Sequence, residues 1–145
     1  MIQIEQSHVV KRPVEHVFAF AAHPENNPKW WEPIVDSKLL TAEPIQKGTR
    51  FREVGKSPMG PVETVFEVTV YEPPRQATYK VVSGPIPAEV IQTFEPVEGG
   101  TRLTVRVQLQ PRGLIGLLLP LMRRRLSQSW KRSLVTLQGL LEARP

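Results

Sequence analysis

Residues 114–141 read LIGLLLPLMRRRLSQSWKRSLVTLQGLL and predict one long amphipathic α-helix, from which much of the remaining architecture follows. The apolar residues recur at steps of three or four, the helical period; they are Leu119, Met122, Leu126, Trp130, Leu134, Leu137 and Leu141. A helix of this length would extend over roughly 40 Å. In so small a chain it must lie along a large apolar surface, and the preceding sequence indicates which one.

The sequence before this helix is typical of an antiparallel β-sheet. Residues Ile2–Val10 alternate and predict a first strand. Two short helices follow, one starting at Pro13 and one within residues 25–30, and Pro33 ends this region. Six further strand candidates are residues 35–41, 49–55, 63–71, 76–82, 89–94 and 101–109. Their short connectors, rich in Gly and Pro, favour pairing of successive strands, so we predict an α+β fold with a curved antiparallel sheet beside the long helix.

The composition bounds the class of protein. At 145 residues, with 40% hydrophobic and 23% charged residues, the chain has the size and composition of one globular domain, residues 1–145. We find no N-terminal signal pattern, and the apolar run at residues 114–122 is too short to span a bilayer. Cysteine is absent, which excludes disulfides and thiolate chemistry and makes the cytoplasm the expected location. Because His8, His16 and His23 include no close-spaced ligand pair, we expect neither a metal nor another cofactor.

The positive charge is concentrated in the C-terminal helix. The chain has a net charge of +5, and from residue 111 onward seven Lys or Arg accompany a single acid, Glu142. These basic residues could be the solvated outer face of the helix, or they could make a weak contact with an anionic membrane. Nucleic-acid binding is not expected, because no aromatic residues alternate with the basic ones. The sequence does not indicate the oligomeric state.

Several motifs carry a resemblance to a known family. They are Pro13-x-x-x-Val17-Phe18, Pro24-Glu25-Asn26-x-Pro28-x-Trp30-Trp31-x-Pro33, Gly48-Thr49-x-Phe51, Val68-x-x-Tyr71-Glu72-Pro73-Pro74-Arg75 and Gly99-Gly100-Thr101-Arg102-Leu103. With these motifs in this order, the chain resembles the SRPBCC, or START-like, superfamily and within it the bacterial polyketide cyclase/dehydrase-like branch. The resemblance extends from Ile4 to Glu142.

This resemblance implies a helix-grip fold and a cavity. In that fold a seven-stranded curved antiparallel sheet wraps around the long C-terminal helix, and two short helices after the first strand close one end. The superfamily uses the cavity between sheet and helix for lipids, sterols, polyketides and other apolar or aromatic molecules. Some members catalyse cyclisation or dehydration there, and many only bind or carry a ligand, so the resemblance implies no particular reaction.

Alternation along the strands predicts which residues face such a cavity. The predicted ligand-binding residues comprise apolar wall residues, scattered polar groups on the strands, and residues of the second short helix and the long helix. They are His8, Trp31, Glu53, Thr64, Phe66, Tyr79, Val90, Gln92, Phe94, Leu118, Met122 and Trp130.

Three of the polar residues allow two interpretations each. His8 could act as an acid or base, or it could be a half-exposed histidine near a strand end. Glu53 lies two residues after Phe51 and therefore on the same face of the strand. If this face points inward, burial would favour the neutral carboxyl, which suits proton transfer; if Glu53 points outward, it would lie beside Arg52. Tyr79 could donate a hydrogen bond to a ligand or pack as an ordinary core tyrosine.

Pro120 predicts a kink or a separate turn near the start of the long helix, because proline cannot donate a helical hydrogen bond. The apolar residues before it, Leu114, Ile115, Leu117 and Leu118, could form a movable lid at the cavity mouth or the packing face of a kinked helix.

Two functions from different classes fit these observations. The first is binding or transport of a hydrophobic or aromatic small molecule, and the second is a cyclase or dehydratase acting in the same cavity. The sequence contains no acid pair at fixed spacing, nucleophile elbow or metal cluster, which favours binding. Convergence of His8, Glu53 and Tyr79 within hydrogen-bond reach would instead favour catalysis.

Overall fold

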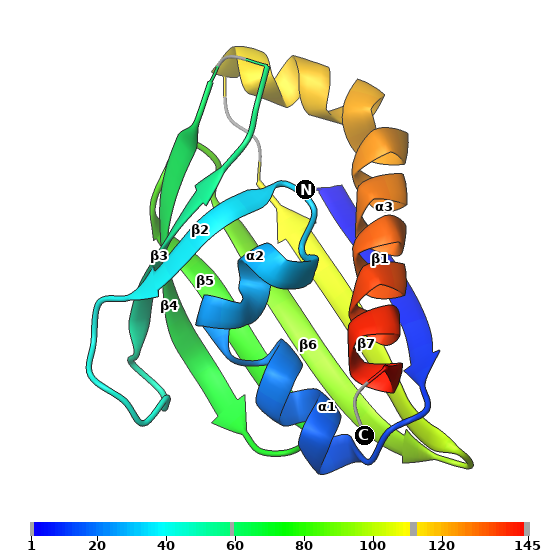
Figure 1. Ribbon diagram of the computed structural model, residues 1–145. Coiled ribbons are helices and arrows are strands. Elements are labelled where there is room, and N and C mark those ends of the chain that lie inside the picture. Colours follow the sequence, from blue (N-terminus) through cyan, green and yellow to red (C-terminus); the bar gives the residue numbers. More distant parts are fainter. Residues whose placement is uncertain (1, 59, 111–112, 144–145) are drawn as a thin grey trace.

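The computed structural model describes residues 2–58, 60–110 and 113–143 (Figure 1). The elements are β1 (Ile2–Val10), α1 (Val14–Ala21), the 3-10 turn η1 (Pro24–Asn26), α2 (Asn27–Trp30), β2 (Ile34–Leu39), β3 (Arg50–Gly55), β4 (Val62–Glu72), β5 (Gln76–Ser83), β6 (Ala88–Val97), β7 (Gly100–Leu109) and α3 (Gly113–Glu142). This order confirms the predicted architecture. The second short helix, predicted within residues 25–30, consists of η1 and α2. Pro28 lies in the first turn of α2, where its missing N–H leaves no helical bond unmade.

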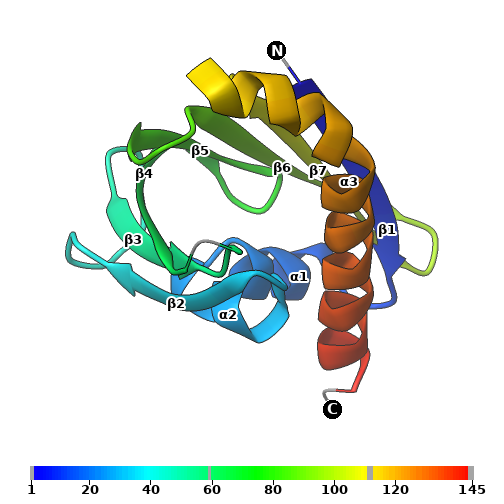
Figure 2. The same ribbon diagram turned by 90° about the horizontal axis from the view of Figure 1, so that it is seen from above.

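The seven strands form one antiparallel sheet in the order β1-β7-β6-β5-β4-β3-β2. Strands β2 to β7 form a meander, as the short connectors predict. The last strand, β7, also pairs with the first, β1, with Ile4 opposite Val107. Register shifts interrupt the pairing of β4 with β5, and such bulges bend a strand. Seen along the sheet, the strands curl into an open half-barrel, with α1 and α2 at one end and α3 along the open side (Figure 2).

Helix α3 confirms the predicted stripe only in its second half. Trp130, Leu134, Leu137 and Leu141 are buried, and this half runs beside β1, where Gln6 Nε2 donates to Ser127 Oγ at 2.7 Å. The first part, which contains Pro120, runs in a different direction across the upper end of the sheet (Figure 1). The side chains of Leu114, Ile115 and Leu119 lie outside the described part. No helix among the described residues combines the length and apolar character needed to cross a membrane.

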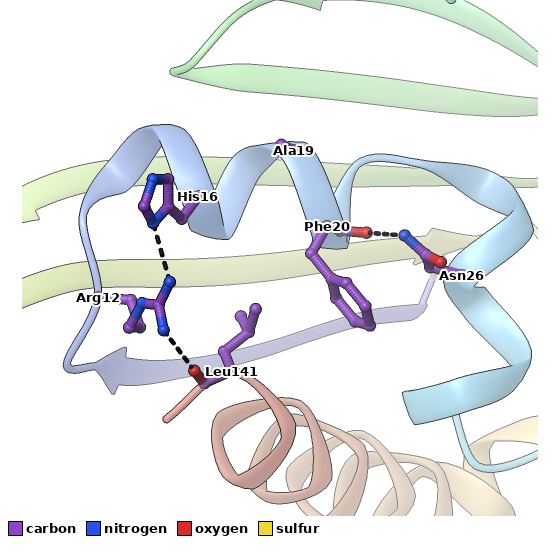
Figure 3. Close-up of a pocket in the computed structure, with 6 residues that line it drawn as sticks. All are labelled: Arg12, His16, Ala19, Phe20, Asn26 and Leu141. Atoms are coloured by element: carbon purple, nitrogen blue, oxygen red, sulfur yellow. Dashed lines mark hydrogen bonds between the residues drawn. The ribbon is translucent and has the colours of Figure 1, made fainter. Parts of the chain in front are cut away.

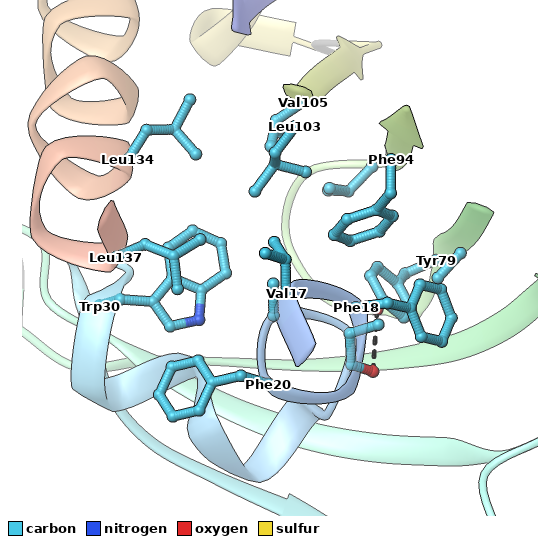
Figure 4. Packing of buried hydrophobic residues seen from close by; sticks show 14 of the residues in the cluster. Val17, Phe18, Phe20, Trp30, Tyr79, Phe94, Leu103, Val105, Leu134 and Leu137 are labelled. Carbon is cyan, nitrogen blue, oxygen red and sulfur yellow. Dashed lines mark hydrogen bonds between the residues drawn. The ribbon is translucent and has the colours of Figure 1, made fainter. Parts of the chain in front are cut away.

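The hydrophobic core fills the lower end of the half-barrel. Helix α1 inserts Val17 and Phe18 between the concave face of the sheet and α3 (Figure 4). The Phe18 ring lies 5.0 Å from the ring of Phe94 and 5.5 Å from that of Tyr71. Because α1 occupies this end, the space between sheet and α3 can remain hollow only toward the other end.

The Gly99-Gly100 motif closes the β6–β7 hairpin for steric reasons. Gly99 has a φ of 85°, which side chains rarely adopt. A Cβ atom at Gly100 would collide with the carbonyl oxygen of Val10, so only glycine lets β7 begin against the end of β1.

Candidate functional site

A cavity of about 200 Å³ lies between the concave face of the sheet and α3. Its walls come from β1, β4, β5, β6, β7, α3 and the segment after α2. The lining residues are Ile4, Trp31, Pro33, Thr64, Phe66, Val81, Ile86, Ala88, Val90, Val107, Leu109, Leu126, Ser129 and Trp130. No charged side chain is among these described lining residues, and their hydroxyl groups are those of Thr64 and Ser129. The lining is therefore mostly apolar, and its side-chain hydrogen-bonding groups are these two hydroxyls and the indole N–H groups of Trp31 and Trp130.

Three tryptophans form the wall between α2 and α3. The Trp31 and Trp130 rings are 4.6 Å apart, and Trp30 lies 6.5 Å from Trp31 and 6.2 Å from Trp130. Trp30, at the end of α2, is fully buried and is not a lining residue of the cavity, whereas Trp31 is only partly buried and lines it. Large rigid rings at this position give a ligand a flat apolar contact surface.

Glu53 faces inward and is almost completely buried, with 1% of its surface exposed. Burial raises the pKa of its carboxyl from 4.5 to about 8, against the opposing effect of a hydrogen bond from Asn27 Nδ2 to Oε2 at 2.5 Å. Ser37 lies opposite Glu53 on β2, and its hydroxyl also opposes the rise in the pKa of Glu53, although no hydrogen bond of good geometry reaches Ser37 Oγ or Glu53 Oε1 within the described part of the chain. Glu53 is not a lining residue of the cavity, although its partner across the β3–β4 pair, Thr64, is one.

Tyr79 and Gln92 bind the C-terminal end of α1. The Tyr79 hydroxyl has the Gln92 Oε1 at 2.9 Å and the Ala22 carbonyl oxygen at 3.2 Å, while Gln92 Nε2 donates to the Ala21 carbonyl oxygen at 3.4 Å. Helix ends leave such carbonyls without intrahelical partners. The two side chains that alternation predicted as ligand contacts are thus already paired within the protein.

Replacing Tyr79 by phenylalanine should therefore destabilise the fold by about 1–3 kcal/mol, because the buried Gln92 Oε1 loses a donor. The measurement is the urea unfolding midpoint. Tyr71→Phe is the matched control, since the Tyr71 hydroxyl makes no hydrogen bond within the described residues. Equal midpoints for the two variants would contradict a role of Tyr79 in holding α1.

The other predicted residues lie away from the cavity. His8 is half-buried on β1 and its Nδ1 is 3.1 Å from the Ser7 carbonyl oxygen. Phe94 packs against Phe18 in the lower core. Leu118 and Met122 lie on the first part of α3, where 57% and 39% of their surfaces are exposed. His8, Glu53 and Tyr79 have different hydrogen-bond partners and do not contact one another through hydrogen bonds.

Five of the twelve predicted residues line the cavity: Trp31, Thr64, Phe66, Val90 and Trp130. Sequence reasoning missed other lining residues as site residues. Val81 and Leu109 share their strand faces with predicted inward residues, so alternation could have found them. Ile86 lies in the β5–β6 connection, where no periodicity applies.

A second hollow, of about 370 Å³, lies outside the sheet where α1 meets the end of α3 (Figure 3). There Arg12 donates to the Leu141 carbonyl oxygen at 3.2 Å and lies 2.9 Å from His16 Nδ1, and Asn26 donates to the Phe20 carbonyl oxygen at 3.1 Å. These contacts join α1 to its neighbours. The apolar cavity is the stronger candidate for a ligand site.

Residues 1–142 match the family described as polyketide cyclase / dehydrase and lipid transport. The chain belongs to this family. Among curated proteins, none matches the chain. The family membership confirms the resemblance that the motifs indicate, and it agrees with a hollow between sheet and α3.

Solved structures show the same fold at low sequence identity. TTHA0849 from Thermus thermophilus has a TM-score of 0.83 at 18% identity, with 98% of each chain covered. DR_A0006 from Deinococcus radiodurans has a TM-score of 0.75 at 18% identity, with 97% of this chain and 98% of that one covered. StfQ, a di-domain ARO/CYC from the steffimycin biosynthetic pathway, has a TM-score of 0.76 at 15% identity, with 97% of this chain and 50% of that one covered. At these identities the family fold is shared, and the site chemistry must be argued from this chain.

Proposed function

We propose that residues 1–145 act as one domain in the cytoplasm that binds or carries a hydrophobic or aromatic small molecule, such as a lipid or polyketide, between sheet and α3. The observation that carries this proposal is the apolar lining of the cavity. Ligand sites of this kind are mostly apolar, with a few placed polar groups.

The lining indicates the chemistry of the ligand. Burial of apolar surface would supply most of the affinity, at about 25 cal/mol per Å² before the costs of association are deducted. Thr64 could donate a hydrogen bond to a ligand oxygen, whereas the Ser129 hydroxyl already donates to Glu32 Oε1 at 3.4 Å and could accept from a ligand donor; both would select among ligands of similar shape. A volume of about 200 Å³ suits a small aromatic molecule or one segment of a longer chain.

A second candidate is an enzyme of the polyketide cyclase or dehydratase type. One observation favours it: Glu53 is a buried acid whose pKa is raised to about 8. The likeness to StfQ supports it at the level of fold only. Against it, Glu53 does not line the cavity, and His8 and Tyr79 do not converge on it. Binding therefore has the better support.

Filling the cavity tests the binding proposal. Val90 lies on its wall, so Val90→Phe should weaken binding of an apolar fluorescent dye by at least about tenfold, or about 1.4 kcal/mol. Fluorescence titration measures the effect. Ile91→Phe is the matched control, because Ile91 points to the opposite face of the same strand.

Ala88→Phe provides a second, less buried position on the same wall, in case Val90→Phe destabilises the sheet. Unchanged dye affinity in both folded wall variants would refute the cavity as the binding site. An equal loss of dye affinity in the control variant Ile91→Phe would also refute the cavity as the binding site.

A further inference from the structure

The first part of α3 exposes leucines where a surface helix normally carries polar residues. The exposed fractions are 72% for Leu117, 57% for Leu118, 81% for Leu121 and 39% for Met122. An amphipathic helix of a globular protein turns its apolar side inward and its polar side to water. Adjacent exposed apolar side chains of this kind mark an interaction surface.

Two of these side chains are neighbours along the helix. Leu117 and Leu121 are four residues apart and occupy one row, which Arg125 continues. The row is exposed to solvent, and this part of α3 crosses the upper end of the half-barrel instead of following β1 (Figures 1 and 2). We name residues 113–125 the α3 arm.

The α3 arm is also strongly basic. It contains Arg123, Arg124 and Arg125 and no acidic residue. Arg123 Nη2 donates to the Gln3 carbonyl oxygen at 3.2 Å, which holds the end of the arm against β1. Arg124 and Arg125 are exposed and form no ion pair within the described part of the chain. Two guanidinium groups thus lie beside the leucine row with their donors directed to solvent.

We propose that the α3 arm docks on the surface of an anionic lipid bilayer, with its leucines in the headgroup–acyl boundary and its arginines on lipid phosphates. A helix with bulky apolar residues on one face and adjoining basic residues is suited to this position. A nucleic acid would leave the leucines without a partner. A second copy of the chain would cover the leucines but would leave the arginines without opposite charges from its own arm, because residues 113–125 contain no acidic residue.

Docking would bring the cavity close to the bilayer. Leu126, Ser129 and Trp130 line the cavity and follow the arm directly along α3. A ligand leaving the membrane would have a short path to the chamber. The docking itself goes beyond the proposed function and does not depend on it, because vesicles can be bound by protein with an empty or a closed cavity.

Vesicle flotation of the purified chain tests the proposal. We expect binding to vesicles of phosphatidylcholine with phosphatidylglycerol at least about tenfold stronger than to phosphatidylcholine alone, with a decrease at high salt. The double variant Arg124→Gln, Arg125→Gln should lose about tenfold or more on anionic vesicles, since each basic residue near the surface contributes roughly fivefold. Leu117→Asn, Leu121→Asn should lose a similar factor.

The control is Lys131→Gln, Val135→Asn, which removes an exposed basic and an exposed apolar residue from the second half of the same helix. It should bind anionic vesicles within about twofold of the unmodified chain, since neither change touches the arm. Equal losses in the control and arm variants, or no preference for anionic vesicles, would overturn the proposal. A dimer seen by light scattering that the leucine variant abolishes, without vesicle binding, would overturn it in favour of self-association. If the leucine variant melts at a lower temperature, the variant of the exposed Arg124 and Arg125 decides between these outcomes.

Discussion

Replacing Trp130 by alanine should lower the free energy of unfolding by about 3–5 kcal/mol. Trp130 retains only 6% of its surface exposure, and its ring lies against Trp31 at 4.6 Å and near Trp30 at 6.2 Å. Truncation removes the ring contacts with Trp30 and Trp31 and enlarges the adjoining cavity, so lost burial and the new void add together. The urea midpoint and the thermal midpoint measure the change.

Val135→Ala is the matched control on the same helix, because Val135 is 52% exposed and its truncation should change the free energy of unfolding by less than about 0.5 kcal/mol. Trp130→Phe should fall between the two, since a smaller ring retains part of the contact. A midpoint for Trp130→Ala equal to that of the control would mean that the second half of α3 does not hold the sheet.

Replacing Glu53 by glutamine should stabilise the protein above neutral pH and flatten the pH dependence of its stability. Burial raises the pKa of Glu53 from 4.5 to about 8. Between these values the folded state keeps a proton that the unfolded state releases, so stability falls as pH rises through this window. Each pKa unit corresponds to about 1.4 kcal/mol, which gives a cost of about 3 kcal/mol at pH 7. Below pH 4.5 the ionisable group costs nothing, and the variant and the parent should converge.

Denaturant unfolding from pH 4 to 8 measures this difference. The glutamine side chain keeps an oxygen for the Asn27 amide, so the hydrogen bond to α2 remains. Glu63→Gln on β4 is the control: the Glu63 side chain is 59% exposed and contacts Arg52, and its replacement should leave the pH dependence of stability nearly unchanged. A parallel pH dependence of Glu53→Gln and the parent would show that this carboxyl does not titrate in that window.

Local patterns in the chain were sufficient to predict most of the fold. A period of 3.6 places Trp130, Leu134 and Leu137 on one buried face of α3, and a period of two assigns the inward faces of the strands. These patterns work because burial of a face is repeated at every turn or every second residue. The alternation that places Glu53 on the same strand face as Phe51 also indicated that its carboxyl could face inward, and Glu53 is buried.

The partners of the inward polar residues were decided only by tertiary structure. Alternation directs Tyr79 and Gln92 inward, but whether they meet a ligand or another element depends on what covers that part of the sheet, and the end of α1 covers it. Asn27, far from Glu53 in sequence, supplies the hydrogen bond to that buried acid for the same reason.

The sequence also did not indicate how much of α3 packs against the sheet. The apolar period runs through Met122 without interruption, yet the sheet supports α3 only from about Leu126 onward, and Met122 remains 39% exposed. Periodicity records which residues share a face of a helix. Where that face finds a packing partner, a cavity or solvent depends on contacts between segments remote in sequence, which only the folded chain brings together.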